Sequence, residues 1–240
     1  MTEHSDILGY SIANFGKEKN GDSFLFEYLD EEGLLIAVVA DGVSQQPCDW
    51  LASLTTCRTV IDQFKKNKEQ KELSKRLWES IAYTSKFVAS TEGKCHKMAA
   101  TLSIVVCQQS SEEFFYANIG DSRIYSLYNG TLKQLTTDDV TIRKERILTP
   151  AGTRVIDRPI LTKVIGQDNI AFNINRSTIR TGEALILETD GFYDARKATF
   201  NNIMLEFGDA EDFKAGFAAL TSKLEILRGD DLTAIALKRK

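Results

Sequence analysis

Five aspartates of this 240-residue chain stand beside glycines at the ends of apolar, strand-like segments. They are Asp22, Asp41, Asp121, Asp190 and Asp230. Asp-Gly and Gly-Asp-Ser sequences form turns, and a turn is the ordinary explanation for any one of them. That explanation is weaker for all five together, because the segments after Asp41 and Asp190 do not return as hairpin strands.

Carboxylates gathered in one place repel one another and raise each other's pKa unless a cation neutralises them. Mg²⁺ and Mn²⁺ prefer shells of a few carboxylate oxygens completed by water. The glycine after Asp41 would let a backbone carbonyl approach such an ion without a side chain between them. Two ions ~3.5–4 Å apart can clamp a phosphoryl oxygen and activate a water molecule. These residues could therefore support metal-assisted chemistry on a phosphate group.

The sequence lacks the residues that other kinds of catalysis require. There are only two histidines, His4 and His96, which leaves little for an imidazole-rich metal site or a Ser-His-Asp triad. Glycine-rich nucleotide-binding motifs, GxSxG and CxxxxxR are absent. A net charge of −4 and a pI near 5.4 argue against binding to nucleic acids or anionic membranes. The longest apolar run, Leu34–Ala40, is too short to span a bilayer.

The four cysteines are predicted to be reduced, buried thiols. They show no zinc-binding spacing, and a cytoplasmic chain would keep them reduced. No signal peptide is expected, because Glu3 and Asp6 precede any apolar stretch. We therefore expect a cytoplasmic protein. The cysteines are Cys48, Cys57, Cys95 and Cys107.

Hydrophobic periodicity predicts the elements that must position the aspartates. It predicts helices over 49–66, 71–90 and 209–227, with Trp50 and Trp78 in the core. Residues 136–165 are polar, basic and irregular, and are expected to form a mobile excursion outside the core. Because strands come in consecutive runs, antiparallel sheets covered by helices are favoured over a βαβ fold. Strands are predicted over 7–14, 23–29, 34–40, 101–108, 113–119, 123–128, 131–135, 184–188 and 232–237.

Taken in order, the motifs resemble those of the metal-dependent protein serine/threonine phosphatases of type 2C, in their bacterial single-domain form. Residues 20–23 (Asn-Gly-Asp-Ser) and 39–42 (Val-Ala-Asp-Gly) match the first two aspartate motifs of that family. Residues 118–123 match its Gly-Asp-Ser-Arg hairpin, and residues 189–191 and 230–233 match its last two motifs. Residues 98–102, 135–138 and 158–166 resemble its Met-Gly-Thr-Thr strand and the segments that open and close its flap.

This resemblance implies a fold. It would be α+β, a four-layer α-β-β-α sandwich with two central antiparallel sheets flanked by helices. One domain would cover residues 1–240, with a flap-like insertion at about 136–165.

The resemblance also implies a chemistry. Two core Mg²⁺ or Mn²⁺ ions would activate a water that hydrolyses phosphoserine or phosphothreonine in proteins. The partners would be a phosphorylated protein and an opposing serine/threonine kinase, with no nucleic acid or membrane, and the chain would be a monomer. The core ligands would be Asp22, Asp41, the Gly42 carbonyl, Asp190 and Asp230, and a third, weaker ion would be held by Asp121 with Asp190.

Four positions depart from the family's pattern. Lys17 stands where an arginine usually holds the substrate phosphate, and lysine offers a point charge instead of a bidentate fork. Val43 and the residues after it replace a His or Met followed by Gly-Gly, which removes the proton donor proposed for animal members. Asp231 replaces an asparagine, and Asp139 replaces a histidine.

Two other functions stay open. Lys17, Val43 and the missing Gly-Gly would suit a non-catalytic regulatory or binding module on the same fold, although retention of the four core aspartates argues for catalysis. A hydrolase of small phosphate esters is disfavoured but open. His96 is expected to be an exposed loop residue. Basic residues within 136–165 either steer phosphoprotein toward the cleft or form a solvated face; they are Arg143, Lys144, Arg146, Arg154 and Arg158.

Overall fold

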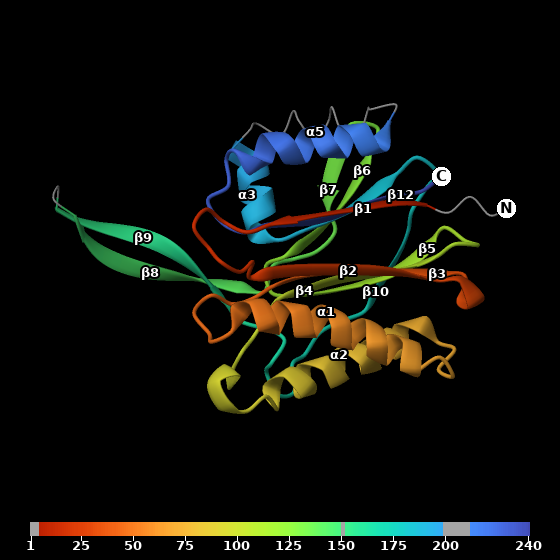
Figure 1. Cartoon of the computed structure of the whole chain (residues 1–240), viewed down its shortest axis with the longest axis horizontal. Helices are drawn as coiled ribbons and strands as arrows, with labels where there is room; N and C mark the ends of the chain where they lie inside the picture. Colours follow the sequence, from red (N-terminus) through yellow and green to blue (C-terminus); the bar gives the residue numbers. More distant parts are fainter. Residues whose placement is uncertain (1–4, 150–151, 199–211) are drawn as a thin grey trace.

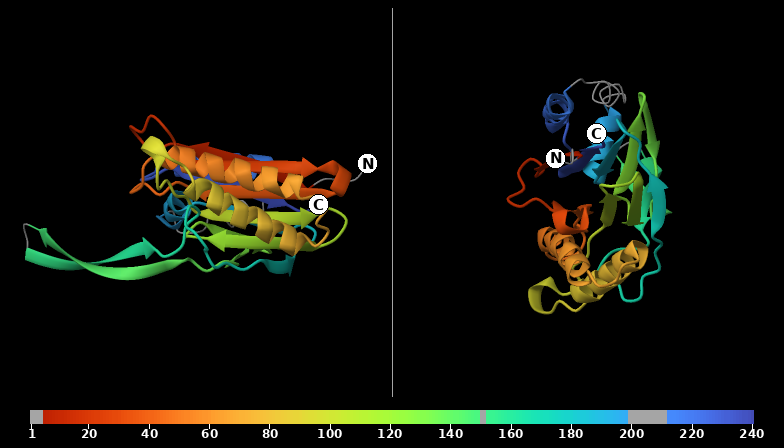
Figure 2. Two further views of the ribbon diagram at one scale, coloured as in Figure 1. Left: turned by 90° about the horizontal axis from the view of Figure 1, so that it is seen from below. Right: turned by 90° about the vertical axis from the view of Figure 1, so that its right-hand side faces the viewer.

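The computed structural model describes residues 5–149, 152–198 and 212–240, which form four layers (Figure 1). Two five-stranded antiparallel sheets pack face to face. Helices α1 (Asp49–Lys66) and α2 (Leu73–Ala89) cover the outside of one sheet. Helices α3 (Asp190–Ala198) and α5 (Phe213–Glu225) cover the outside of the other, and Figure 2 shows the layers end-on. The predicted α-β-β-α sandwich is confirmed.

The two sheets bring distant parts of the chain together. In the first sheet, in spatial order, lie β1 (Asp6–Ile12), β12 (Leu232–Lys238), β11 (Ala184–Glu188), β6 (Arg123–Tyr128) and β7 (Thr131–Gln134). In the second lie β10 (Asn175–Thr178), β5 (Glu113–Ile119), β4 (Leu102–Gln108), β3 (Leu34–Asp41) and β2 (Asp22–Leu29). Two 3-10 turns, η1 (Asp30–Glu32) and η2 (Gly93–Cys95), complete the short elements.

Strand β3 shows why its sequence is apolar throughout. Alternate residues such as Ile36 and Val38 pack toward α1 and α2. The residues between them, such as Leu35 and Val39, pack against the other sheet. Because both faces of the strand are covered, its residues are apolar up to Asp41 at its end. Burial of each large aliphatic side chain contributes ~1.5–3 kcal/mol to the sandwich.

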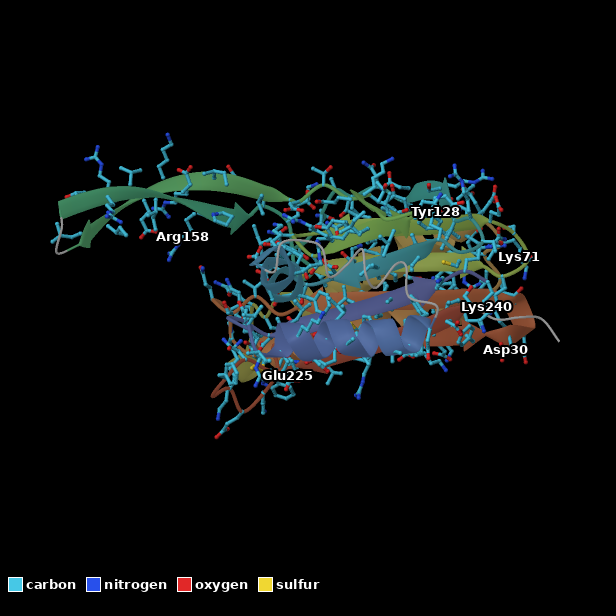
Figure 3. All side chains as sticks on the ribbon, turned by 90° about the horizontal axis from the view of Figure 1, so that it is seen from above. Asp30, Lys71, Tyr128, Arg158, Glu225 and Lys240 are labelled. Atoms are coloured by element: carbon cyan, nitrogen blue, oxygen red, sulfur yellow. A yellow bond between two sulfur atoms is a disulfide. The ribbon has the colours of Figure 1, made fainter. Side chains whose placement is uncertain are left out.

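Strands β8 (Val140–Thr149) and β9 (Gly152–Leu161) form a hairpin, the arm, that projects from one end of the sandwich (Figures 1 and 2). Figure 3 places Arg158 on the arm, and Asp30, Lys71 and Lys240 at the opposite end of the molecule. The expectation of an irregular segment is wrong, because the two strands pair along their whole length. Most side chains of the arm whose exposure is described are exposed, so no buried face imposed an alternating pattern on the sequence.

The predicted elements agree with the observed ones except at a few places. Helix α3 and strand β10 were not predicted, and residues 209–211 of the last predicted helix lie outside the described residues. The prediction for Trp78 is wrong, since 48% of the residue is exposed and its ring stacks on Phe172. Trp50 is only partly buried, beneath the ammonium group of Lys19. In the described chain no helix is long and apolar enough to cross a membrane.

Candidate active site

Asp22 and Asp41 form a directly opposed pair at the ends of β2 and β3. The strand register places Asp22, the first residue of β2, across from Asp41, the last residue of β3. Their carboxyl groups hydrogen-bond to each other, and Asp22 is only 5% exposed. Two carboxyl groups so close repel each other when both are ionised, so the pair requires a proton or a cation.

The third carboxyl group of the site belongs to Asp190, which follows β11 of the other sheet. The Thr189 hydroxyl donates to Asp22 Oδ2 at 2.8 Å and so ties the ends of the two sheets together. Asp190 follows as the first residue of α3, where the helix N-terminus favours negative charge. Its carboxyl group hydrogen-bonds with that of Asp41. We call Asp22, Asp41 and Asp190 the three-aspartate cluster.

Burial and mutual repulsion raise the pKa of every member of this cluster. Burial, together with the charge of Asp190, raises the pKa of Asp22 to about 7. Burial and the charges of Asp22 and Asp190 raise the pKa of Asp41 well above its usual value. Burial and the charge of Asp230 raise the pKa of Asp190. No lysine or arginine within residues 5–149, 152–198 and 212–240 forms an ion pair with any of the three. Protons or an added cation must therefore balance their charge.

A cleft of about 600 Å³ opens over the cluster. Asp41 and Asp190 line it together with Asp121 and Asp230, whereas Asp22 lies behind Asp41. Burial and the charge of Asp190 raise the pKa of Asp121 to about 6. Asp230 is at the rim, with 58% of its side chain exposed. The structure thus gathers all five aspartates noted in the sequence at one end of the sandwich.

Lys17 also lines the cleft, but its ammonium group has a partner that the sequence did not indicate. It lies 2.7 Å from Asp231 Oδ2 and 3.7 Å from Asp230 Oδ1. The buried Asp231 carboxylate also accepts backbone N–H bonds from Asn14 and Gly21, each at 2.7 Å. Two of the departures from the family's pattern, Lys17 and Asp231, therefore form one compensating ion pair.

Hydroxyl groups fix the backbone beneath the cleft. Thr101 Oγ1 accepts from the Asp41 N–H at 2.9 Å and lies 2.6 Å from the Ser122 hydroxyl. Gly120 packs on Thr101 at φ +96°, and a Cβ there would lie 2.7 Å from Thr101 Cγ2. This close approach explains why the residue before Asp121 is a glycine.

Asp139 closes the base of the arm. Its N–H donates to the Gly120 carbonyl oxygen at 2.9 Å, and its carboxylate pairs with Lys163 at 2.7 Å. Next to it, Asp138 accepts hydrogen bonds from Arg123, the nearest at 2.6 Å. Asp139, which stands where the family usually has a histidine, therefore has a structural role that the sequence did not show.

A disulfide bond holds the loop that follows Asp41. Val43 N–H donates to the Ala99 carbonyl oxygen at 2.9 Å, and Cys48 is bonded to Cys95 with their Cα atoms 5.4 Å apart. The prediction of reduced thiols is therefore wrong for these two residues, whereas Cys57 and Cys107 are buried free thiols as predicted. The partners are 47 residues apart, so only the tertiary fold brings them together. The neighbouring His96 is exposed, as predicted.

The donor atoms at this end of the sandwich suit Mg²⁺ or Mn²⁺. All are carboxylate or carbonyl oxygens, and a divalent cation would replace the protons that the cluster otherwise needs. At Gly42 any larger residue would clash, because a Cβ would lie 2.1 Å from the Asp49 carbonyl oxygen. The three carboxyl groups are turned toward one another, and in the described chain no three acidic, His or Cys side chains already converge on a point that could hold an ion. Side-chain rotation would therefore accompany metal binding.

Comparison with known proteins decides the family. The protein phosphatase 2C model matches residues 16–231, which is most of the chain. The chain belongs to the protein phosphatase 2C family. Serine/threonine phosphatase stp of Listeria welshimeri is 32% identical over 127 residues, covering 50% of this chain and 48% of that protein. The crystal structure of the Mycobacterium tuberculosis serine/threonine phosphatase PstP is 17% identical, covers 99% of each chain and has a TM-score of 0.75. The PstP catalytic domain in complex with two manganese ions is also 17% identical, covers 98% of each chain and has a TM-score of 0.69.

As a protein phosphatase 2C, this chain is an enzyme that removes phosphate from proteins. Its family and its relatives do not favour the alternative of a non-catalytic binding module.

Proposed function

We propose that this phosphatase 2C hydrolyses phosphoserine and phosphothreonine at the cleft over the three-aspartate cluster. The observation that carries the proposal is the charge of that cluster. Three carboxyl groups are gathered where two sheets meet, and no cationic side chain of the described chain pairs with them. A purely structural carboxylate would be paired or moved to solvent, because an unpaired buried charge is costly.

The cluster and its neighbours would hold divalent ions. Two Mg²⁺ or Mn²⁺ ions would be held by Asp22, Asp41, the Gly42 carbonyl, Asp190 and Asp230, and a third by Asp121 with Asp190. When bound, the ions would supply a water nucleophile at neutral pH and neutralise charge developing on the phosphoryl oxygens. The PstP domain with two manganese ions supports this choice of metal and number.

The chain's own residues would orient these ligands and the substrate. Thr189 and Thr101 hold the ends of β11 and β3, so that Asp22 and Asp41 keep fixed positions relative to Asp190. Lys17 presents a positive charge to the cleft with 36% of its side chain exposed. Its pairing with Asp231 fixes where that charge stands, and a substrate phosphate entering the cleft would be attracted to it.

The chain would be a single domain over residues 1–240, and the arm would be its flap-like insertion. The arm would form the wall of the cleft that faces the protein substrate. Arg143, Arg158 and Ile160 of the arm line the cleft. Arg143 lies directly opposite Arg158 in the strand register, and like charges so placed repel each other. Glu145 of the arm pairs with Arg158 at 3.3 Å and relieves part of that repulsion, and an acidic segment beside the phosphorylated residue would relieve the rest. A phosphoprotein substrate, an opposing serine/threonine kinase, a monomeric state and a cytoplasmic location complete the proposal.

The test is phosphate release from a phosphothreonine peptide and from p-nitrophenyl phosphate, with Mn²⁺, Mg²⁺ or EDTA. We expect metal-dependent hydrolysis of the peptide that EDTA and Asp41→Asn abolish. Asp62→Asn, an exposed change on α1, serves as the matched control and should keep full activity. Hydrolysis of p-nitrophenyl phosphate alone would favour a small-ester hydrolase. No hydrolysis of either substrate with either metal would refute the proposal.

A further inference from the structure

The Cys48–Cys95 disulfide joins the two chain segments that flank Asp41 at the cleft wall. We propose that it is a redox-modification site, which a dithiol reductant of the thioredoxin class opens, and that opening it lowers phosphatase activity. The consequence for activity rests on the proposed function, whereas the redox site does not.

Only this pair of cysteines is accessible for exchange. Cys48 and Cys95 are partly exposed, whereas Cys57 and Cys107 are buried. Burial raises the pKa of Cys107 to about 12 and also raises that of Cys57, so both stay as unreactive thiols. A reductant in solution therefore meets one reactive sulfur pair, at the end of the loop whose residues 43–46 line the cleft.

The disulfide constrains the start of α1. Cys48 precedes Asp49 at φ +59°, a left-handed conformation that costs a non-glycine residue ~1–3 kcal/mol and persists only where the surroundings enforce it. No side chain caps the helix there, but the Cys48 carbonyl oxygen accepts from the N–H groups of Leu51 and Ala52 at 2.9 Å. The bond to Cys95 is the covalent tie that holds Cys48 in place.

Direct contacts continue from Cys48 to the proposed metal ligands. The backbone of Asp49 packs so closely on Gly42 that no side chain fits between them. Between Val43 and Cys48 the loop is largely exposed. Val43 at its start donates its N–H to the Ala99 carbonyl oxygen, whereas the bond from Gln46 N–H to the Val43 carbonyl oxygen lies within the loop itself. Release of Cys48 would therefore let the loop over residues 43–48 move, and Ser44, Gln45 and Gln46 of this loop line the cleft.

The second cysteine braces the neighbouring segment. The Cys95 carbonyl oxygen accepts from Met98 N–H at 3.0 Å, and Ala99 and Ala100 then pair with Val43 and Gly42. Thr101 follows and hydrogen-bonds the backbone of Asp41 at 2.7 Å. The Cys48–Cys95 bond thus links two segments that also contact each other through hydrogen bonds between residues 41–43 and 99–101, at the end of β3.

The chemistry is ordinary thiol–disulfide exchange. A thiolate of the reductant attacks one sulfur of the pair, which breaks the Cys48–Cys95 bond and forms a mixed disulfide with the reductant. The reductant's second thiol then displaces the enzyme thiol. Two electrons pass to the cysteine pair, which takes up two protons, and the reductant leaves as a disulfide. Exposed disulfides of this kind are the labile, regulatory ones.

The test compares the oxidised and reduced full-length protein. Alkylation after unfolding, followed by mass spectrometry, should find two free thiols in protein equilibrated in an oxidising glutathione buffer, and four after treatment with thioredoxin and its reducing system. We expect kcat/KM for a phosphothreonine peptide to fall about tenfold on reduction, since small displacements in an active site cost this much or more. Hydrogen exchange should rise over residues 42–49 and 98–101.

Two variants provide controls. Cys48→Ser/Cys95→Ser should show the low activity and fast exchange of the reduced protein under both conditions, whereas Cys107→Ala should respond as the natural sequence does. Four alkylated thiols in the oxidising buffer, or equal kinetics and exchange in both redox states, would overturn the proposal. If exchange responds to reduction but neither state hydrolyses phosphate, the redox site stands and the proposed function fails.

Discussion

Two acidic residues, one buried and one partly buried, lie two positions apart at the junction of β11 and α3, and the protein balances them in opposite ways. Glu188 is fully buried, and Arg196 of α3 neutralises it with hydrogen bonds of 3.0–3.2 Å to its carboxylate oxygens. Asp190 contacts the carboxyl group of Asp41 instead, and in the described chain it has no ion-pair partner. Burial raises the pKa of Glu188, but the Arg196 guanidinium opposes that rise.

The contrast separates a structural carboxylate from one kept for an exchangeable cation. An arginine fixed beside Asp190 would compete with any divalent ion for the same oxygens. Leaving the cluster without such a partner makes the apo fold less stable, and it leaves the charge available for binding. The first two predictions below test whether Glu188 and Asp190 differ in this way, and the other two extend the test to the carboxyl groups around the cleft.

The largest effect should come from Asp190→Ala. Because this removes the carboxylate that joins the cluster to the second sheet, we expect turnover of a phosphothreonine peptide to fall by at least ~10³-fold, ~4 kcal/mol in barrier terms. The melting temperature of the apo protein should stay the same or rise, because one repelling carboxylate is gone. Turnover within about tenfold of the natural sequence would remove Asp190 from the site.

Arg196→Met should act on stability. It would leave the Glu188 carboxylate buried without its cation, which costs ~3–5 kcal/mol of unfolding free energy in urea denaturation. Lys197→Met breaks an exposed pair with Asp194 on the same helix and should cost less than about 1 kcal/mol. Adding Glu188→Gln to Arg196→Met should recover part of the loss. If Arg196→Met and Lys197→Met have equal effects, Glu188 is not held as a buried ion pair.

The stability of the apo protein should fall as pH rises. In the folded state the pKa values of Asp22 (about 7) and Asp121 (about 6) lie above the unfolded value of ~3.9, so the folded state binds more protons between these limits. The contribution of these two groups to stability is then highest near pH 4 and decreases toward pH 7. Urea unfolding in EDTA should show this slope, and Asp22→Asn should reduce it. A flat profile from pH 4.5 to 7.5 would show that the cluster does not retain protons.

The smallest effect should come from Lys17→Arg. Arginine would offer two parallel N–H donors to a phosphate, so we expect KM for the phosphopeptide to fall about two- to fivefold, with Mn²⁺ affinity unchanged. Lys17→Ala should raise KM, and combining it with Asp231→Asn separates the loss of phosphate binding from the cost of an unpaired Asp231. Identical kcat/KM values for the natural sequence, Lys17→Arg and Lys17→Ala would move Lys17 out of the site.

The strand pattern predicted antiparallel sheets covered by helices, with buried strands such as Leu34–Asp41, and the resemblance to the phosphatase family implied the four-layer sandwich. The sequence also predicted the five aspartates, since each has a recognisable local motif. It could not predict the pairs Lys17–Asp231, Glu188–Arg196 or Cys48–Cys95. The first and third join positions far apart in the sequence, and the second depends on a helix that the sequence did not reveal. The arm escaped prediction for a different reason: its strands bury neither face, so no periodicity marks them.

The position of β12 has a consequence for synthesis of the protein. Residues 232–238 pair with β1 on one side and β11 on the other, yet they leave the ribosome after every other described element. Until they emerge, β1 has no neighbour in its sheet, and neither Asp230 nor Asp231 is present to complete the cleft rim or to position Lys17. A nascent chain can therefore fold α1, α2 and the β2–β5 sheet early while its active site stays incomplete. Phosphatase activity would begin only when translation of this strand is over.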